Sequence, residues 1–489
     1  MVFVSLSLFI FTQHDKCKNQ LNTALVLKFS QSTTPHKRHK EKRRRGIVKT
    51  MKIGTSNIFK DQSLSVTKRL VPWTLCTLLL PITLLQLYLY FSPQIQLPPS
   101  SPITVTSHSS ISLPPTSTTS SEKDVVHETP CDYSNGEWIQ DPIGPLYNAT
   151  TCNTIKESEK CIPNGRPDID YLYWKWKPSQ CHLPRFEPHT FLQLIKNKHV
   201  VFVGDSLARN QLESLLCMLA TVSATNLIYG NSEDNKFRRW HFPSHNANFS
   251  LYWSPFLVQG VERGQNKGPS CNTMHLDHVN ERWARDIDQM DLIVISFGHW
   301  FLLPSVYIEG GSVLGSLNCP ELNHTEMDFY EPLRKVLRTS LNSIIERKVA
   351  KGSGIDVIVK TFSPDHFEGD WNKGGTCSKT RPYREEEKKL EGMDAEIRRI
   401  QIEEMENAKA KANEFGGFRL EALDVTKLAL LRPDGHPGPY MNPFPFANGV
   451  QEYVQNDCVH WCLPGPVDTW NEILLEMMKG WKEKPRSKE

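Results

Sequence analysis

The stretch HVVFVGDSLARNQ, residues 199–211, decides the fold. Its segment 200–203 is short, apolar and rich in β-branched residues, which predicts a buried strand. From Leu207 onwards, apolar residues recur with the spacing of a helix. Ser206 is therefore expected at the N-terminus of a helix, where outward-pointing N–H groups favour negative charge. Asp and Ser are also preferred helix caps, so the stretch by itself fits an ordinary N-cap as well as a nucleophile.

The segments beyond this stretch alternate between strand-like and helix-like patterns. Strands are predicted at 291–297, 355–362 and 418–425, and an amphipathic helix is predicted within the highly charged segment 384–415. A coiled coil is disfavoured there, because its heptads are neither regular nor sustained. Apolar strands that alternate with helices predict an α/β sandwich around a mostly parallel central sheet. In such sheets the functional side chains gather at the carboxyl ends of the strands.

The segment 71–91 is uncharged and apolar over a length that can cross a bilayer. Lys68 and Arg69 precede it and few basic residues follow, which predicts a signal-anchor with a cytosolic N-terminus and a lumenal remainder. A cleaved signal peptide is the alternative reading. The formal net charge of +3 is too close to zero to indicate a nucleic-acid partner.

Four regions follow from these patterns: a cytosolic tail at 1–69, a transmembrane helix at 70–91, a disordered Ser/Thr/Pro-rich stem at 92–130, and a lumenal catalytic domain at 131–485. Residues 1–50 fit this scheme poorly, and a second methionine follows at Met51. We expect Met51 to be the working start and the leader to be an over-extended gene model, a cytosolic basic tail being the alternative.

The cysteines and sequons indicate the secretory pathway. Of the 12 cysteines all but Cys17 and Cys76 lie beyond the stem, and this even number predicts up to five disulfides whose connectivity the sequence leaves open. These cysteines form no Cys-x-x-Cys pair, so we expect no metal site. Three sequons lie on the same side of the predicted span, at Asn148, Asn248 and Asn323.

A second distinctive segment, NDCVHWCLPGPVDTWNE, occupies residues 456–472. Asp457 and His460 are three residues apart, so one local turn can bring both to the same site, and the cysteines at 458 and 462 would pin that turn. A serine nucleophile needs a histidine that is oriented by a carboxylate. Asp468 is expected to be the N-cap of the final helix.

Gly-Asp-Ser near the start of an α/β domain, with Asp-x-x-His near its end, resembles the GDSL/SGNH hydrolase-like enzymes. More narrowly, GDSLARNQ followed by SFGHWF, SPDHFEGDWNKGG and DCVHWCLPGPVDTWNE is similar to the plant trichome birefringence-like proteins. This resemblance implies an SGNH-like three-layer sandwich. It also implies a single-pass type II Golgi membrane enzyme that O-acetylates a cell-wall polysaccharide, with xyloglucan favoured over mannan or xylan.

The resemblance also implies roles for individual residues. Ser206 would be the nucleophile, His460 the general base and Asp457 the orienting carboxylate, whereas Asp205 would brace the turn. From the chemistry we expect the Ser206 backbone N–H as one oxyanion donor, with Arg209 and Gly298 near the developing charge. Asn210 and Gln211 are expected either to support that group or to lie on the helix surface. Many relatives carry asparagine just before the Gly-His-Trp cluster; Ser296 stands on this strand here, which places more weight on Arg209.

Aromatic side chains beside polar ones suit sugar rings, so His299, Trp300, Trp371 and His436 are candidate substrate contacts, with core or rim packing as the alternative. No bound cofactor is expected, but an acetyl donor is required. The sequence leaves its identity open; a donor derived from acetyl-CoA and supplied by another membrane protein is one source. An acetyl esterase with the same triad, or a non-catalytic protein that binds wall glycans, are the alternative functions.

Overall fold

The computed structural model describes residues 131–230, 236–264, 270–449, 453–483 and 486. The predicted cytosolic tail, transmembrane helix and stem lie outside these residues. Within the described part, no helix combines the length and apolar character that crossing a bilayer requires.

A seven-stranded sheet forms the centre of the fold, in the order β13-β12-β9-β3-β6-β5-β4. Its strands are β3 (His199–Gly204), β4 (Asn226–Gly230), β5 (Phe237–Phe242), β6 (Ala247–Trp253), β9 (Leu292–Ser296), β12 (Ile355–Lys360) and β13 (Phe418–Leu423). From β13 to β6 all neighbours are parallel, whereas β5 is antiparallel to both β6 and β4. The four predicted strands are confirmed as four neighbours in the parallel part, and the complete sheet is mixed.

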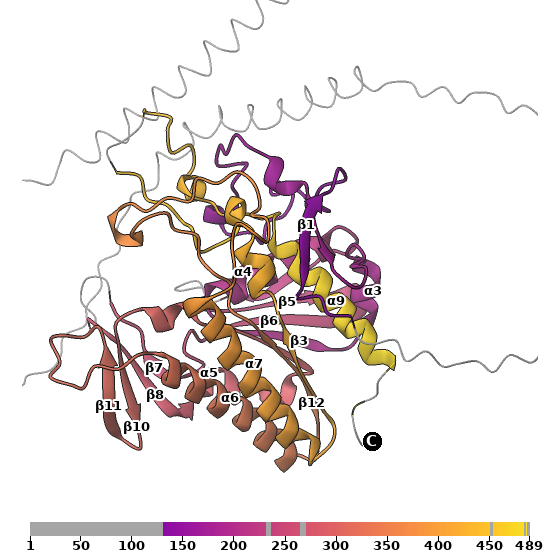
Figure 1. The fold of residues 1–489 in the computed structure, drawn as a ribbon. Helices are drawn as coiled ribbons and strands as arrows, with labels where there is room; N and C mark the ends of the chain where they lie inside the picture. The colour runs from indigo at the N-terminus through magenta and orange to yellow at the C-terminus, as the bar shows by residue number, and fades with distance from the viewer. Residues whose placement is uncertain (1–130, 231–235, 265–269, 450–452, 484–485, 487–489) are drawn as a thin grey trace, which may run out of the picture. The chain divides into compact units, whose positions relative to one another are not determined.

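Helices cover both faces of this sheet because its central strands are apolar on both sides. In β3, Val200 and Phe202 belong to the core on one face, while Val201 and Val203 belong to the core on the other. The first core is completed by α3 (Pro188–Leu194), α4 (Ser206–Ala220) and α9 (Val467–Glu483), and the second by α6 (Tyr330–Ala350) and α7 (Gly392–Asn413). Figure 1 shows α6 and α7 side by side across their face of the sheet. The predicted α/β sandwich is confirmed, and the helix expected within 384–415 is α7.

Several elements around the central sheet were not predicted. A four-stranded sheet has the order β11-β10-β8-β7, and β1 pairs with β2 in a separate two-stranded sheet. These strands are β1 (Gly136–Gln140), β2 (Trp174–Pro178), β7 (Val258–Val261), β8 (Asn272–Val279), β10 (Ser305–Glu309) and β11 (Ser312–Leu317). The short helices are α5 (Glu281–Ala284), α8 (Thr426–Leu430), η1 (Glu157–Glu159), η2 (Asp170–Leu172), η3 (Pro243–His245), η4 (Ile287–Gln289), η5 (His299–Leu302), η6 (Trp371–Lys373), η7 (Pro433–Gly435) and η8 (Pro439–Met441).

Five disulfides join the ten cysteines beyond residue 130, as their even number predicted. The pairs are Cys131–Cys181, Cys152–Cys217, Cys161–Cys462, Cys271–Cys319 and Cys377–Cys458. The turn around His460 is held at both of its ends, because Cys458 and Cys462 bond to different distant segments. The expectation that these two cysteines pin the turn is confirmed.

The expectation for Asp468 is wrong. Helix α9 begins at Val467, so Asp468 lies inside its first turn and is not the residue that precedes it. Its carboxylate Oδ1 accepts hydrogen bonds from Tyr147 Oη at 2.9 Å and from Ser214 Oγ at 2.6 Å. These contacts tie α9 to α4 and to the N-terminal segment, so the carboxylate serves packing between elements.

Gly204 sits where β3 leaves the sheet and turns into α4. Its φ is +154°, and a Cβ built there would lie 1.7 Å from the carbonyl oxygen of Ser296 on the neighbouring strand β9. Only glycine avoids this overlap, because real Cβ atoms do not approach a backbone oxygen so closely. The close approach of β3 to β9 therefore fixes the position at which Ser206 leaves the sheet.

Substituting Gly204→Ala is expected to lower the free energy of unfolding by about 2–5 kcal/mol, since it adds a steric overlap to an unfavourable φ. The matched control is Gly352→Ala, which also has a positive φ of +62° but no atom within 4 Å of its Cβ. It should cost about 1 kcal/mol. Denaturant unfolding followed by tryptophan fluorescence measures both. Equal destabilisation by the two substitutions would contradict the steric argument.

Candidate active site

Ser206 is the first residue of α4, directly beyond the carboxyl end of β3. Asp205 is the N-cap of this helix, and its Oδ1 accepts a hydrogen bond from the Leu207 N–H at 2.9 Å. The predicted role of Asp205 in bracing the turn is thus confirmed. Ser206 is half-buried, whereas Asp205 and Leu207 on either side are buried. At this turn the serine is the side chain that solvent can reach.

Asp457 and His460 form a compact pair on the turn between the two pinned cysteines. Asp457 Oδ1 accepts the backbone N–H groups of Val459 at 3.1 Å and His460 at 2.9 Å. Its Oδ2 accepts a hydrogen bond from His460 Nδ1 at 2.7 Å. This contact places the imidazole proton on Nδ1 and leaves Nε2 as the nitrogen that can accept a proton. Nε2 is buried and has no hydrogen-bond partner among the described residues.

The electrostatics of this pair suit a general base. Burial by itself would lower the pKa of His460, but the carboxylate of Asp457 outweighs burial and raises that pKa above its ordinary value. Burial also opposes ionisation of Asp457, yet the imidazole and two backbone N–H groups hold its pKa below its ordinary range. Asp457 is therefore ionised at neutral pH, and it stabilises the imidazolium that forms when His460 takes up a proton.

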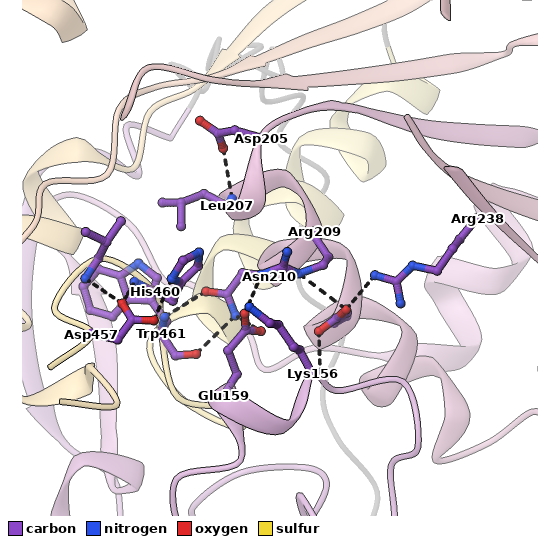
Figure 2. A network of polar contacts seen from close by, with 12 residues as sticks. Lys156, Glu159, Asp205, Leu207, Arg209, Asn210, Arg238, Asp457, His460 and Trp461 are labelled. Carbon is purple, nitrogen blue, oxygen red and sulfur yellow. Dashed lines mark hydrogen bonds and ion pairs between the residues drawn. The ribbon is translucent and has the colours of Figure 1, made fainter. Parts of the chain in front are cut away.

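Asn210 joins the histidine turn to the helix that carries Ser206. Its Oδ1 accepts the Trp461 N–H at 2.9 Å, and its Nδ2 donates to the Trp461 carbonyl at 3.2 Å. Figure 2 shows the His460 ring between Asp457 and the start of α4. The charges of Lys360 and His460 also oppose the rise that burial causes in the pKa of Asp205.

His460 Nε2 and Ser206 Oγ do not form a hydrogen bond in this structure. In unliganded active sites such contacts are often long and tighten only in the reacting complex. The structure thus brings the predicted base and its carboxylate to the end of α4 that carries Ser206. The catalytic roles of these residues stay predictions.

Arg209 lies near the imidazole, but its guanidinium is already engaged. Its Nη2 contacts Glu159 Oε1 at 2.8 Å, and its Nε lies 3.7 Å from Glu213 Oε1. The positive charge of Arg209 acts to lower the pKa of His460. The role of Arg209 in stabilising an oxyanion stays a prediction.

The end of β9 forms the neighbouring part of the site. Ser296 faces Gly204 in the ladder between β3 and β9, and its buried Oγ has no hydrogen-bond partner within the described part of the chain. Two residues further on, Gly298 has a φ of +150°, and a Cβ there would lie 2.7 Å from the Phe362 ring. The roles of Gly298 and Asn210 near the oxyanion also stay predictions.

Two of the candidate substrate contacts follow Gly298. The ring of His299 stacks on Phe362 with 4.5 Å between ring centroids, and burial lowers the pKa of His299 to about 3. The imidazole of His299 is therefore neutral at physiological pH. Trp300 is half-buried and meets Trp253 edge-to-face, with 5.8 Å between centroids. The contribution of these residues to substrate binding stays a prediction.

The other two candidates occupy opposite environments. Trp371 in η6 is 63% exposed, so its indole is available to a ligand. His436 is buried, and both of its ring nitrogens contact other protein atoms. Nδ1 donates to the carbonyl of His460 at 2.7 Å, and Nε2 lies 2.7 Å from His366 Nδ1. In this conformation His436 supports the backbone of the histidine turn, and its contact with substrate stays a prediction.

Three residues near the site escaped the sequence analysis: Glu159, Trp253 and Lys360. Glu159 lies in a charged, irregular segment and resembles an ordinary surface residue. Lys360 is buried at the end of β12, where burial lowers its pKa to about 8. A lysine at the end of the apolar run 357–359 is the signal that could have revealed it. Within the described part, no group of three or more His, Cys, Asp or Glu residues is placed to hold a metal ion.

The mixed central sheet with helices on both faces is consistent with an SGNH-like α/β domain. Residues 183–477 match the PC-Esterase family, a GDSL/SGNH-like acyl-esterase family found in Pmr5 and Cas1p, and residues 129–182 match the PMR5 N-terminal domain. The chain therefore belongs to the PC-Esterase family.

Curated relatives cover most of the chain. Xyloglucan O-acetyltransferase 1 of Populus trichocarpa is 59% identical over 425 residues, which are 87% of this chain and 96% of the relative. Xyloglucan O-acetyltransferase 1 of Arabidopsis thaliana is 56% identical over 353 residues, 72% of this chain and 81% of the relative. Protein trichome birefringence-like 25 of Arabidopsis thaliana is 40% identical over 396 residues, 79% of this chain and 85% of the relative. The resemblance to trichome birefringence-like proteins is confirmed.

The Asp457→Asn substitution tests the electrostatics of the pair. With the carboxylate removed, burial dominates, so we expect the pKa of His460 to fall from above its ordinary value to below it. NMR titration of the histidine ring protons measures this directly. The control is Asp277→Asn on β8, which should leave the titration of His460 unchanged. An unchanged pKa in Asp457→Asn would show that the carboxylate does not control the imidazole.

Proposed function

We propose that this protein is a polysaccharide O-acetyltransferase that moves an acetyl group to a hydroxyl of xyloglucan through an acetyl-Ser206 intermediate. The observation that carries the proposal is the unpartnered Nε2 of His460, oriented by Asp457 and held at the end of α4 where Ser206 lies. The identity of 59% to a xyloglucan O-acetyltransferase supports this acceptor over mannan or xylan.

In the first half-reaction, Ser206 Oγ attacks the carbonyl carbon of the acetyl donor while His460 Nε2 accepts its proton. The imidazolium, held by Asp457, then gives this proton to the leaving group of the donor as the bond between acetyl carbon and leaving group breaks. The Ser206 N–H makes no hydrogen bond to the described residues, so it is available to the oxyanion.

In the second half-reaction, a sugar hydroxyl attacks the acetyl-serine and passes its proton to His460 Nε2. The bond from Ser206 Oγ to the acetyl carbon breaks, Oγ regains the proton, and the acetylated sugar leaves. An acetyl esterase uses the same steps with water as the nucleophile. The description of the matched family as acyl-esterases makes esterase activity the second candidate function.

In this proposal the acceptor sugar binds in the cavity next to Trp253. Trp253 is the last residue of β6 and pairs with Gly204 at the end of β3. Ser206 follows Gly204 by two residues along the chain. A cavity of about 360 Å³ opens there, and its walls include Trp253, Phe256, Gln259, Glu262, Asn280 and Arg282. Aromatic faces beside hydrogen-bonding side chains suit an uncharged sugar ring. Trp300 packs edge-to-face on the rings of Trp253 and Phe256.

We further propose that the enzyme is a single-pass type II protein of the Golgi membrane, with an anchor at 70–91, a stem at 92–130 and a lumenal catalytic domain. Five disulfides among the cysteines beyond the stem support an oxidising compartment. The acetyl donor would then derive from acetyl-CoA through another membrane protein that delivers it to the lumen.

The transferase proposal predicts a gain of acetyl mass when the full-length protein meets an acetyl donor and xyloglucan oligosaccharides. Ser206→Ala and His460→Ala should each reduce this gain by at least about 10³-fold, because serine and base act as one unit. Ser223→Ala and His245→Ala, away from the site, should keep wild-type rates. Loss of acetyl from acetylated oligosaccharides without any gain would favour the esterase. Transfer that survives Ser206→Ala would contradict the acetyl-serine intermediate.

The acceptor cavity predicts a specific kinetic effect of Trp253→Ala. KM for xyloglucan oligosaccharides should rise about ten-fold, because an aromatic contact contributes roughly 0.5–1.5 kcal/mol beyond area burial. Hydrolysis of a small acetyl ester, which needs no sugar contact, should continue at the wild-type rate. The control is Phe415→Ala, an exposed aromatic beyond the end of α7. An unchanged KM for the oligosaccharides in Trp253→Ala would place the acceptor elsewhere.

A further inference from the structure

The geometry points to Glu159 as a positioning residue for the reaction: from the N-terminal domain, it holds Arg209 and Asn210, and through them it sets the His460 turn against the helix that carries Ser206. This inference rests on the proposed function. It makes the PMR5 N-terminal domain part of the catalytic apparatus.

Glu159 is fully buried, and both of its carboxylate oxygens are used. Oε1 pairs with Arg209 Nη2 at 2.8 Å, and Oε2 accepts a hydrogen bond from Asn210 Nδ2 at 2.9 Å. Its backbone carbonyl accepts the N–H of Leu463 at 2.9 Å. Glu159 thus contacts both the helix of Ser206 and the segment that follows His460, and Figure 2 shows it below both of them.

The contact with Asn210 is the step that reaches the site. The same Nδ2 that donates to Glu159 also donates to the Trp461 carbonyl, while Oδ1 accepts the Trp461 N–H. An amide side chain with a carboxylate on its NH₂ group cannot flip its oxygen and nitrogen without losing both sets of contacts. Glu159 therefore fixes the orientation of Asn210, and Asn210 fixes the backbone next to His460.

Burying a carboxylate lowers the stability of the fold unless the carboxylate is paired. A buried glutamate at this position therefore needs an explanation. Packing does not require it, because disulfides already join the same segments: Cys152 bonds to Cys217 on α4, and Cys161 bonds to Cys462 beside the histidine turn. Disulfides attach the N-terminal domain on both sides of Glu159. A substitution of Glu159 can therefore change the position of the catalytic groups without detaching this domain, and the two effects can be measured separately.

Glu159 also acts on the imidazole through its charge. The charged and titratable groups that face His460 are Asp457 on its own turn, Glu159 from η1, Arg209 from α4, Asp205 at the N-cap of α4, and His299 from η5. Glu159 raises the pKa of His460 and Arg209 lowers it. Replacing Glu159 by glutamine removes the negative charge that raises this pKa and leaves the positive charge of Arg209 without its ion-pair partner. The pKa of His460 should therefore fall.

The test compares Glu159→Gln with Glu157→Gln in the full-length protein. Glu157 lies in the same short helix, but its side chain is 64% exposed. Glu159→Gln should keep the melting temperature within a few degrees. It should reduce kcat for acetyl transfer to xyloglucan oligosaccharides about 10²-fold at unchanged KM, since small displacements of catalytic groups have effects of this size. The acid limb of its pH–rate profile should move to lower pH, because a lower pKa keeps His460 neutral further into acid.

Glu157→Gln should match the wild type in all three measurements. Glu159→Asp keeps the charge on a shorter side chain, so it should lower kcat while the acid limb stays in place. If Glu159→Gln fails to fold, Glu159→Asp tests the positioning role instead. A normal melting temperature with a reduced kcat in Glu159→Asp supports that role, and a wild-type kcat contradicts it.

The failure of this inference differs from the failure of the proposed function. Wild-type kcat and pH profile in Glu159→Gln, with Ser206→Ala inactive, would overturn the positioning role and leave the acetyltransferase intact. If the wild-type protein transfers no acetyl group, the pKa of His460 measured by NMR in Glu159→Gln still decides: a fall supports the coupling, and an unchanged value overturns it.

Discussion

The candidate site depends on two hydrogen bonds between the side chain of Asn210 and the backbone of Trp461, two residues 251 positions apart in the sequence. Asn210 follows Ser206 by one turn of α4, so the two lie on the same side of the helix. Trp461 directly follows His460. A single amide side chain therefore links the helix that carries Ser206 to the turn that carries His460. The elements on either side hold this contact in place.

On the helix side, the sheet supplies the constraint. Gly204 allows β3 to approach β9 closely. Asp205 then caps α4 with its side chain, and its backbone N–H donates to the Ser296 carbonyl at 3.1 Å. On the histidine side, two disulfides and the buried His436 hold the turn. Ionisable groups gather near this site, among them the buried Asp205 and Lys360 and the half-buried His460. Such groups reduce stability unless they are paired, and they concentrate where a protein performs chemistry.

The sequence predicted the parts of this structure that carry a local pattern. Strands β3, β9 and β12 stand out because both of their faces are buried, whereas β13 is buried at only part of its positions. Asp457 and His460 stand out because one turn brings them together. Strands β5 and β6 and the sheet of β7, β8, β10 and β11 were missed. Strands such as β5, β7, β8 and β11 mix buried residues with half-buried or exposed ones, so their apolar pattern is weaker than that of a strand buried on both faces. Glu159 was missed for another reason: its partner Arg209 is 50 residues away, and η1 has no periodicity that would mark its buried face.

The central claim, that Ser206 carries the acetyl group, is tested most directly by trapping the intermediate. The full-length protein would be mixed with an activated acetyl ester and no sugar acceptor, quenched in acid, digested and analysed by peptide mass spectrometry. The account predicts one added acetyl group on Ser206 that disappears when xyloglucan oligosaccharide is added before the quench. An acetyl group on another residue that is passed to the sugar, or transfer without any acetylated Ser206, would contradict it.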